Sequence, residues 1–221
     1  IQAGECVVFD PLSIRRRKQG KSNRRAYCAF EYVYLARADS YINDIPIYAV
    51  RERIGEVLAE EKGVEGDVVI GVPETALPFA LSYSCKKSIP VKLGFMRTGR
   101  HVRSALKPTQ LERLMGVQLK LNPIKAAVDG KDVVLIDDSV VRGNTLKNTV
   151  LNLRRRGAKR VHVRVGSPAI ISYCPFGTEV PPIDELIGKA LSKDEIAEII
   201  GADSFSYLSI DGLVKAIGLP K

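Results

Sequence analysis

Long apolar runs are missing from this sequence of 221 residues: none approaches the roughly 18 consecutive residues of a membrane span. The start also lacks the pattern of a signal peptide. Cysteine is scarce, and no Cys-x-x-Cys pair occurs among the four widely separated thiols, Cys6, Cys28, Cys85 and Cys174. We therefore expect no membrane partner and no disulfide framework, and a reducing, cytoplasmic setting.

Excess positive charge is confined to one stretch, from Arg15 to Arg25, which holds seven basic residues and no acid. Without these seven, the formal net charge falls from +9 to +2. Such a run could contact nucleic acid through phosphates. No aromatic residues interleave it, however, as stacking on bases requires. The pattern favours a solvated loop, and nucleic acid is not an expected partner.

At 45% apolar residues, the chain can bury the core of one large domain. Apolar runs alternate with amphipathic stretches, which predicts an α/β fold with a mainly parallel sheet. We predict strands over residues 5–10, 28–37, 68–73, 91–96, 132–137 and 160–165. We predict helices over residues 48–62, 76–87, 110–119, 146–156, 193–200 and 209–217.

The expected organisation is a single domain with a core at about residues 46–170. The N-terminal strands of residues 5–40 and the C-terminal helices of residues 183–218 would pack on it. Because the chain opens at Ile1 rather than at Met, we expect a fragment or a processed product.

The stretch Val133–Leu146 carries the strongest functional pattern: an apolar strand ends in Asp137 and Asp138, and a polar loop then leads into a helix. Ligands of open parallel sheets bind outside the carboxyl ends of the strands. A helix N-terminus offers unpaired N–H groups to a phosphate. Two solvated acids at the end of a buried strand are the plainer explanation. Gly143 and Thr145 at the helix start favour instead a phosphate site with carboxylates beside it.

Residues 134–145, Val-Leu-Ile-Asp-Asp-Ser-Val-Val-Arg-Gly-Asn-Thr, resemble the phosphoribosyl pyrophosphate motif of type I phosphoribosyltransferases. Residues 30–40, Phe-Glu-Tyr-Val-Tyr-Leu-Ala-Arg-Ala-Asp-Ser, resemble a signature of the amidophosphoribosyltransferase family, as do residues 199–204. Residues 72–75, Val-Pro-Glu-Thr, resemble its pyrophosphate loop. The resemblance spans nearly the whole chain and implies the type I phosphoribosyltransferase fold, a mainly parallel sheet flanked by helices, with a small hood and C-terminal helices.

This resemblance implies an enzyme of purine biosynthesis. It would transfer an ammonia nitrogen to C1 of phosphoribosyl pyrophosphate, giving 5-phosphoribosylamine and pyrophosphate, with Mg²⁺ as cofactor. In the family, an N-terminal glutaminase domain supplies the ammonia, and that domain is not part of this sequence. We therefore expect the synthase half, served by a glutaminase domain or subunit, and a homo-oligomer.

The resemblance also implies the site residues. Asp137 and Asp138 would bind the ribose hydroxyls directly or through Mg²⁺, with Thr75 as a further metal ligand and Glu74 beside it. Cations of a closing loop over residues 97–107 would stabilise the leaving pyrophosphate. These catalytic cations would be Arg97 and Arg103. The remaining substrate-binding residues would be Ser139 and, around the 5′-phosphate, Arg142, Gly143, Asn144, Thr145 and Leu146.

Several positions depart from the family pattern. Gly71, Ala76 and Ala38 replace family residues, and Arg97 stands in place of a lysine, an exchange that is not neutral at a point-charge site. These departures affect the leaving-group and closing loops, whereas the donor-binding loop is intact. They keep open an alternative: a non-catalytic paralogue that binds phosphoribosyl pyrophosphate as a regulator or subunit. A nucleobase phosphoribosyltransferase is a third option, and the long signature of residues 30–40 argues against it.

Cys28 and Cys174 lie where some family members place two of the four ligands of a 4Fe–4S cluster. Those members supply the other two from a Cys-x-x-Cys pair beyond the position of Lys221. A four-thiolate cluster needs all four ligands. We therefore expect remnant ligand positions and no intact cluster.

Overall fold

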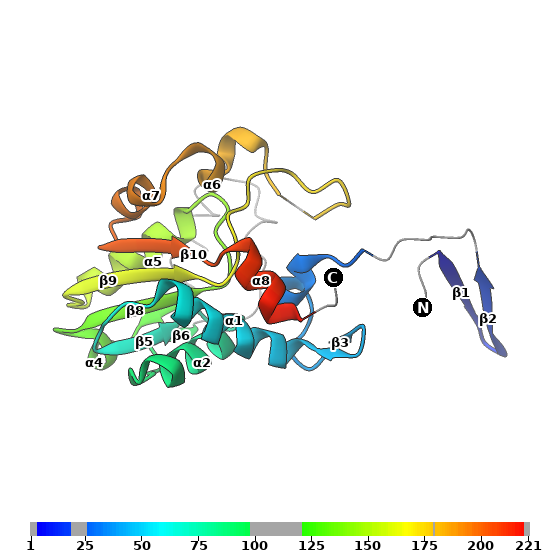
Figure 1. Ribbon diagram of the computed structural model, residues 1–221, viewed down its shortest axis with the longest axis horizontal. Coiled ribbons are helices and arrows are strands. Elements are labelled where there is room, and N and C mark those ends of the chain that lie inside the picture. Colours follow the sequence, from blue (N-terminus) through cyan, green and yellow to red (C-terminus); the bar gives the residue numbers. More distant parts are fainter. Residues whose placement is uncertain (1–3, 19–25, 98–120, 179, 219–221) are drawn as a thin grey trace.

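A computed structural model describes residues 4–18, 26–97, 121–178 and 180–218. Its centre is a four-stranded sheet of order β10–β9–β8–β5 (Figure 1). The strands are β5 (Val68–Gly71), β8 (Asp132–Asp137), β9 (Arg160–Val165) and β10 (Ser204–Tyr207). All neighbouring pairs are parallel, so the four carboxyl ends meet at one edge. The predicted α/β class with a parallel sheet is confirmed.

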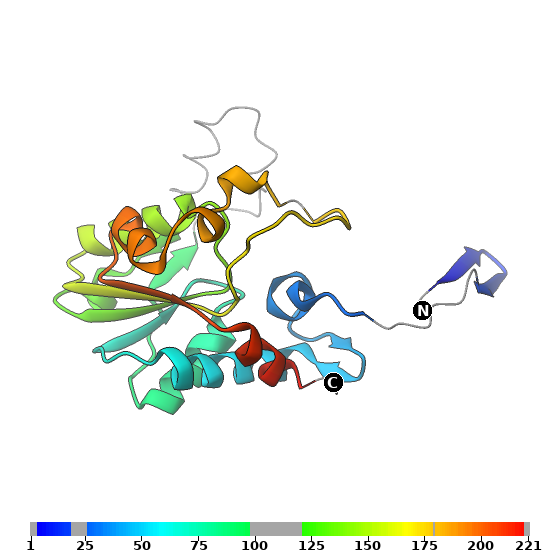
Figure 2. The same cartoon turned by 45° about the horizontal axis from the view of Figure 1, so that its top comes forward.

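Helices cover both faces of the sheet (Figures 1 and 2), as a buried parallel sheet requires. Alternation along β8 divides the core: Val133 and Leu135 join one apolar cluster, and Val134 and Ile136 join the other. The first cluster includes residues of α4 (Lys125–Val128), α5 (Asn144–Arg155), α6 (Ile187–Ala190) and α7 (Lys193–Ile200). The second includes residues of α1 (Ile47–Lys62), α2 (Leu77–Lys87) and α8 (Ile210–Ile217).

Shorter elements complete the described chain. Three antiparallel pairs are β1 (Glu5–Asp10) with β2 (Ser13–Lys18), β3 (Tyr41–Ile42) with β4 (Ile45–Pro46), and β6 (Phe95–Arg97) with β7 (Leu121–Pro123). Two short helical turns are η1 (Glu31–Leu35) and η3 (Ile183–Glu185). The β1–β2 hairpin stands apart from the rest of the described chain in both views (Figures 1 and 2). No helix among the described residues has the length and hydropathy that crossing a bilayer demands.

Most predicted elements are confirmed. The strands over 5–10, 132–137 and 160–165 match β1, β8 and β9, and five helices agree within two residues at each end. The strand predicted over 68–73 already ends at Gly71. The strand predicted over 91–96 is shorter, because Val91 forms only an isolated bridge to Val69 before β6 begins. The helix predicted over 110–119 lies outside the described residues.

The prediction of a strand over residues 28–37 is wrong. These residues instead form the π-helical turn η1, in which the Ala36 N–H donates to the carbonyl of Glu31 at 3.1 Å. Tyr32 and Val33 are buried in the core cluster that contains α1, whereas Tyr34 and Leu35 are exposed. Composition alone does not separate a buried strand from a short buried helix. Here packing on α1, rather than pairing with a strand, determines the structure.

Two further differences concern strands. The basic stretch was predicted to be a loop, but part of it forms the strand β2. This strand pairs with β1, so that Val8 lies opposite Arg15 and Val7 lies opposite Arg16. Residues 19–25 lie outside the described chain. The fourth strand of the central sheet, β10, was not predicted, because its four residues, Ser-Phe-Ser-Tyr, are too few for a clear alternating pattern.

Candidate functional site

Strand β8 carries the two predicted acids to the carboxyl edge of the sheet. Asp137 is the last residue of the strand, and its carbonyl accepts a hydrogen bond from Gly166 N–H at 2.9 Å. The Asp138 N–H donates to Asp137 Oδ1 at 2.9 Å. The Ser139 hydroxyl donates to Asp138 Oδ1 at 2.7 Å. Three consecutive predicted residues thus form one polar group, which we call the acid edge (residues 137–139).

The loop after β5 brings Thr75 to the acid edge. Val72 N–H donates to the carbonyl of Ile136 at 2.8 Å, which ties this loop to β8. Thr75 lies near enough to the carboxyl of Asp138 for its hydroxyl to act against the rise in the pKa of that group. Glu74 is exposed in the same loop. The structure therefore brings together Thr75, Asp137 and Asp138, which come from two neighbouring strands.

Both acids have raised pKa values. Burial raises the pKa of Asp137 well above its usual value, and the neighbouring Asp138 charge raises it further. Burial also raises the pKa of Asp138, although Ser139 and the charge of Arg51 act in the opposite direction. Two desolvated carboxylates side by side are stabilised by a proton, by a cation or by hydroxyl donors.

The oxygen donors at the acid edge fit Mg²⁺. Asp137, Asp138 and Thr75 offer two carboxylates and a hydroxyl, and Mg²⁺ prefers oxygen and keeps several waters or substrate oxygens. Within the described ranges, no three His, Cys, Asp or Glu side chains group as a metal site. The predicted remnant ligands also remain outside any such group: Cys28 is exposed and Cys174 is partly exposed.

The loop after the acid edge presents a helix N-terminus. Gly143 precedes α5 with φ of 76°, a left-handed conformation that favours glycine. A Cβ atom at Gly143 would lie 2.9 Å from Ile187 Cδ1. Asn144 and Thr145 are exposed, and Gly143 places no side chain over the first turn of α5, so its backbone N–H groups can receive an anion. Leu146 is buried in the core, which leaves it only a backbone contribution.

Arg142 makes a contact that sequence reasoning missed. Its side chain forms an ion pair with Glu185 at the end of η3. Beside this pair, Ile187 N–H donates to the carbonyl of Val141 at 3.0 Å. No local pattern predicts Glu185, because 43 positions separate the two charged residues.

Arg51 was also missed. It lies in α1, is only 4% exposed, and donates to the carbonyls of Tyr32 at 3.1 Å and Ala36 at 2.7 Å. Its positive charge acts against the rise in the pKa of Asp138 that burial causes. In sequence, Arg51 is one more polar residue of an amphipathic helix, and nothing local marks it.

The structure does not test the assignment of the two predicted catalytic cations. Arg97 is the last residue of β6, and Arg103 lies outside the described residues. Their assignment therefore stays a prediction.

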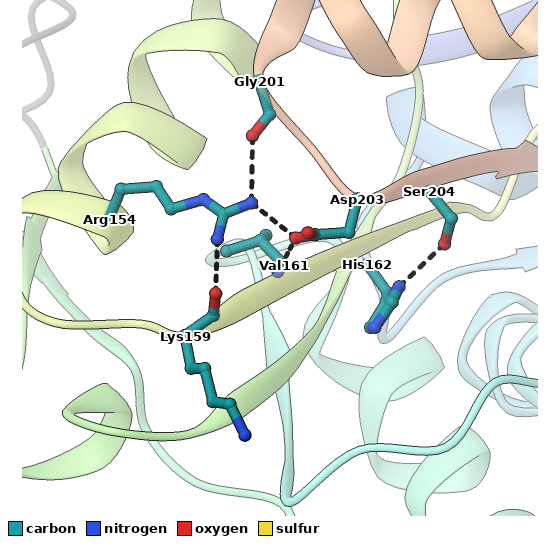
Figure 3. Close-up of polar contacts among 7 residues, drawn as sticks. All are labelled: Arg154, Lys159, Val161, His162, Gly201, Asp203 and Ser204. Carbon is teal, nitrogen blue, oxygen red and sulfur yellow. Dashed lines mark hydrogen bonds and ion pairs between the residues drawn. The ribbon is translucent and has the colours of Figure 1, made fainter.

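The signature of residues 199–204 lies where β9 and β10 begin, and because the strands are parallel this is the end of the sheet opposite the acid edge. Figure 3 shows the contacts of Gly201, Asp203 and Ser204 there. Asp203 accepts a hydrogen bond from Val161 N–H at 2.6 Å and pairs with Arg154. Arg154 also donates to two carbonyls, those of Lys159 at 2.6 Å and Gly201 at 3.4 Å. This part of the resemblance thus has a structural role, because it joins α5 and α7 to the sheet.

Residues 42–166 match the family model of the phosphoribosyl transferase domain. The amidophosphoribosyltransferase of Methanocaldococcus jannaschii is 47% identical over 193 residues, which is 87% of this chain and 41% of the relative. That of Methanothermobacter thermautotrophicus is 41% identical over 240 residues, covering 100% of this chain and 51% of the relative. The chain thus spans about half the length of these curated relatives.

The chain is also similar to a solved structure of an amidotransferase. The glutamine phosphoribosylpyrophosphate amidotransferase of Bacillus subtilis, complexed with ADP and GMP, superposes with a TM-score of 0.82 at 37% identity, covering 97% of this chain and 47% of that chain. The range matched by the family model contains the acid edge, Thr75 and the loop at Gly143. The chain therefore belongs to the phosphoribosyl transferase domain family.

Proposed function

We propose that this chain transfers an ammonia nitrogen to C1 of phosphoribosyl pyrophosphate and releases pyrophosphate. The observation that carries the proposal is the pair Asp137 and Asp138, side by side at the carboxyl end of β8, directly before the helix N-terminus at Gly143. Together these groups match a donor with a pyrophosphate, two ring hydroxyls and a 5′-phosphate. The similarity to amidophosphoribosyltransferases supports the same conclusion.

Each part of the donor has a protein group suited to it. The N–H groups of residues 143–146 and the Thr145 hydroxyl bind the 5′-phosphate. Asp137 and Asp138 accept hydrogen bonds from the ribose hydroxyls or hold Mg²⁺, with Thr75 as a further ligand. When bound, Mg²⁺ neutralises the pyrophosphate and makes it a better leaving group.

The chemical step forms one bond and breaks one. The nitrogen lone pair of ammonia attacks C1 while the bond from C1 to the pyrophosphate oxygen breaks, and the nitrogen then loses a proton to solvent. Positive charge develops on the ribose and negative charge on pyrophosphate. The carboxylates of the acid edge stabilise the positive charge on the ribose, and cations such as Arg97 and Arg103 stabilise the negative charge on pyrophosphate.

The proposal extends to the setting of the reaction. It includes a cytoplasmic location, a homo-oligomer, and a glutaminase domain or subunit that supplies ammonia. The length of the relatives supports such a second unit, since this chain matches only about half of each.

The test is to incubate the purified chain with phosphoribosyl pyrophosphate, MgCl₂ and ammonium chloride at mildly alkaline pH and to assay pyrophosphate. The proposal predicts release that depends on both Mg²⁺ and ammonium. Calorimetric binding of the donor without release would instead support the regulator alternative. A chain that binds no donor would contradict both functions.

A further inference from the structure

The loop before α5 is held by a second segment of the chain, residues 183–190, which comprises η3 and α6. Three consecutive residues of the loop contact this segment. The carbonyl of Val141 accepts from Ile187 N–H at 3.0 Å, and Arg142 forms its ion pair with Glu185. Gly143 lies so close to Ile187 that a Cβ atom there would be 2.9 Å from Ile187 Cδ1. The proposed phosphate site is therefore held in position both by α5 and by this segment.

The segment that carries Glu185 is itself packed on the core. Leu186, which follows Glu185 directly, is fully buried, and Ile187 belongs to the same apolar cluster as α5. Gly188 also packs closely, since a Cβ atom there would lie 3.2 Å from Tyr207 Oη. The backbone of Glu185 thus adjoins packed core, whereas its carboxylate lies at the surface beside the loop.

The ion pair engages only part of the Arg142 guanidinium. The Nε atom of Arg142 donates to Glu185 Oε2, and no hydrogen bond joins its two terminal nitrogens to the described residues. The Arg142 side chain is 51% exposed. A guanidinium binds a phosphate most strongly when two of its N–H groups donate together. Arg142 therefore has two terminal nitrogens that can receive an anion beside Gly143.

The stability of the fold does not explain this ion pair. Both side chains are about half exposed, and exposed ion pairs add little to the free energy of folding. The pair has a different advantage: an arginine that is already held loses less conformational entropy when it binds an anion. It also has a disadvantage, because the negative charge of Glu185 opposes a nearby phosphate. These two effects on anion affinity have opposite signs, so an experiment can separate them.

We propose that Glu185 is a positioning residue of the donor site, which holds the guanidinium of Arg142 so that its terminal nitrogens bind the 5′-phosphate beside the N–H groups of residues 143–146. The inference rests on the proposed function, because it takes this loop as the site of the 5′-phosphate. It assigns a ligand to Arg142 and gives Glu185 a role that acts only through Arg142.

The test measures the affinity for phosphoribosyl pyrophosphate by calorimetry at saturating MgCl₂. Glu185→Gln removes the charge and keeps the size of the side chain. It should bind the donor about fivefold more weakly, because the guanidinium of Arg142 must then be ordered on binding. A carboxylate that merely competed with the phosphate for Arg142 would give tighter binding when removed, and that result would overturn the inference.

A double-mutant cycle tests whether Glu185 acts through Arg142. Arg142→Gln should weaken donor binding about tenfold, since it removes a charged donor to the phosphate. In that background, Glu185→Gln should change the affinity by less than about twofold. A merely structural role of Glu185, in which it stabilises η3, would cost the same factor in both backgrounds, and equal costs would overturn the inference.

Asp184→Asn is the matched control, because Asp184 is an exposed acid of the same helical turn. It removes the same charge and should leave the donor affinity within about twofold of the wild type. A loss as large as that of Glu185→Gln would overturn the inference.

Two smaller ligands locate the effect within the donor. Ribose 5-phosphate carries the 5′-phosphate without the pyrophosphate, and Glu185→Gln should weaken its binding by the same factor as that of the donor. The affinity for pyrophosphate should stay unchanged in this variant. An equal loss for pyrophosphate would overturn the assignment of Arg142 to the 5′-phosphate.

These binding measurements are independent of turnover. Weaker binding by Glu185→Gln, with no pyrophosphate release by the wild type, would uphold the inference and contradict the proposed reaction. Release by the wild type, with unchanged donor affinity in Glu185→Gln, would uphold the reaction and overturn the inference. A wild-type chain that binds no donor would overturn both.

Discussion

At the scale of residues, the acid edge is a pair of desolvated carboxylates that the fold holds in place. Asp137 and Asp138 are partly exposed, and their pKa values are raised because the fold removes water from both carboxyls and because the charge of Asp138 acts on Asp137. Their position could be predicted from sequence, because an apolar strand that ends in two acids before a glycine loop is a local pattern. The partners of the pair could not, because Thr75 and Arg51 lie far away in sequence.

Gly143 should be needed both for its conformation and for the space around it. Gly143→Ala places a Cβ in a left-handed backbone conformation and 2.9 Å from Ile187 Cδ1. We expect a loss of about 1–2 kcal/mol in unfolding free energy from the conformation alone, plus a weaker affinity for phosphoribosyl pyrophosphate. Urea denaturation and calorimetry measure the two effects.

Gly130→Ala is the control, since Gly130 has φ of 69° with open space around its Cβ position. It should lose stability through conformation only and keep its donor affinity. Equal donor affinity in Gly143→Ala and the wild type would show that the loop at Gly143 does not hold the donor.

At the scale of elements, the bounds of a strand or helix are predicted best where the residues of that segment alone determine its structure. β8 is an apolar run bounded by acids, β9 alternates valine with charged or polar residues, and the ends of both strands were predicted to the residue. The prediction of a strand over residues 28–37 failed because an apolar segment of this length suits either a strand or a buried helix. Packing on α1 decides between the two. β10 was missed because four residues give too little alternation to recognise.

Asp203 should be a structural residue of the sheet and not a functional one. Asp203→Asn removes the charge that pairs with Arg154 and weakens the hydrogen bond from Val161 N–H (Figure 3). We expect a loss of about 1–3 kcal/mol in unfolding free energy, since hydrogen bonds to charged groups are the stronger ones. Donor affinity, measured alongside urea denaturation, should not change. A variant with normal stability and weak donor binding would reverse this assignment.

The contact of His162 in β9 with Ser204 in β10 should make the stability of the fold depend on pH. His162 Nδ1 lies 2.9 Å from the Ser204 hydroxyl, and burial, followed by the charge of Arg164, lowers the pKa of His162. The folded state therefore disfavours the protonated ring. This contribution to stability is complete above the unfolded pKa of about 6.5 and is lost as the pH falls below it.

Urea denaturation between pH 8 and pH 5 tests this, with His162→Gln as the comparison. The wild type should lose more unfolding free energy than the variant as the pH falls. Identical pH dependence in the two proteins would rule out His162 as the source.

At the scale of the whole molecule, the described chain is a sheet with helices on both faces and a hairpin that stands apart (Figures 1 and 2). The parallel direction of the strands could be expected from the alternation of strands and helices along the chain. Contacts between distant segments, such as Arg142 with Glu185 or Arg51 with Tyr32, could not be, because each depends on the finished packing.

The β1–β2 hairpin should contribute little to the stability of the rest. We expect that a chain without residues 1–25 keeps its melting temperature within about 2 °C, because β1 pairs with β2 and, among the described residues, neither strand joins the central sheet. Calorimetry of the shortened and full chains measures the difference. A large drop in melting temperature would show that the hairpin is part of the cooperative unit.

The most direct measurement for the whole account is pyrophosphate release by Asp138→Asn, with donor, MgCl₂ and ammonium chloride at mildly alkaline pH. Asp211→Asn, at an exposed acid in the first turn of α8, is the control. We predict that Asp138→Asn lowers the rate about a hundredfold or more, as the loss of a charge aimed at a transition state does, while Asp211→Asn matches the wild type. Undiminished release by Asp138→Asn would contradict the assignment of the acid edge as the site of the reaction.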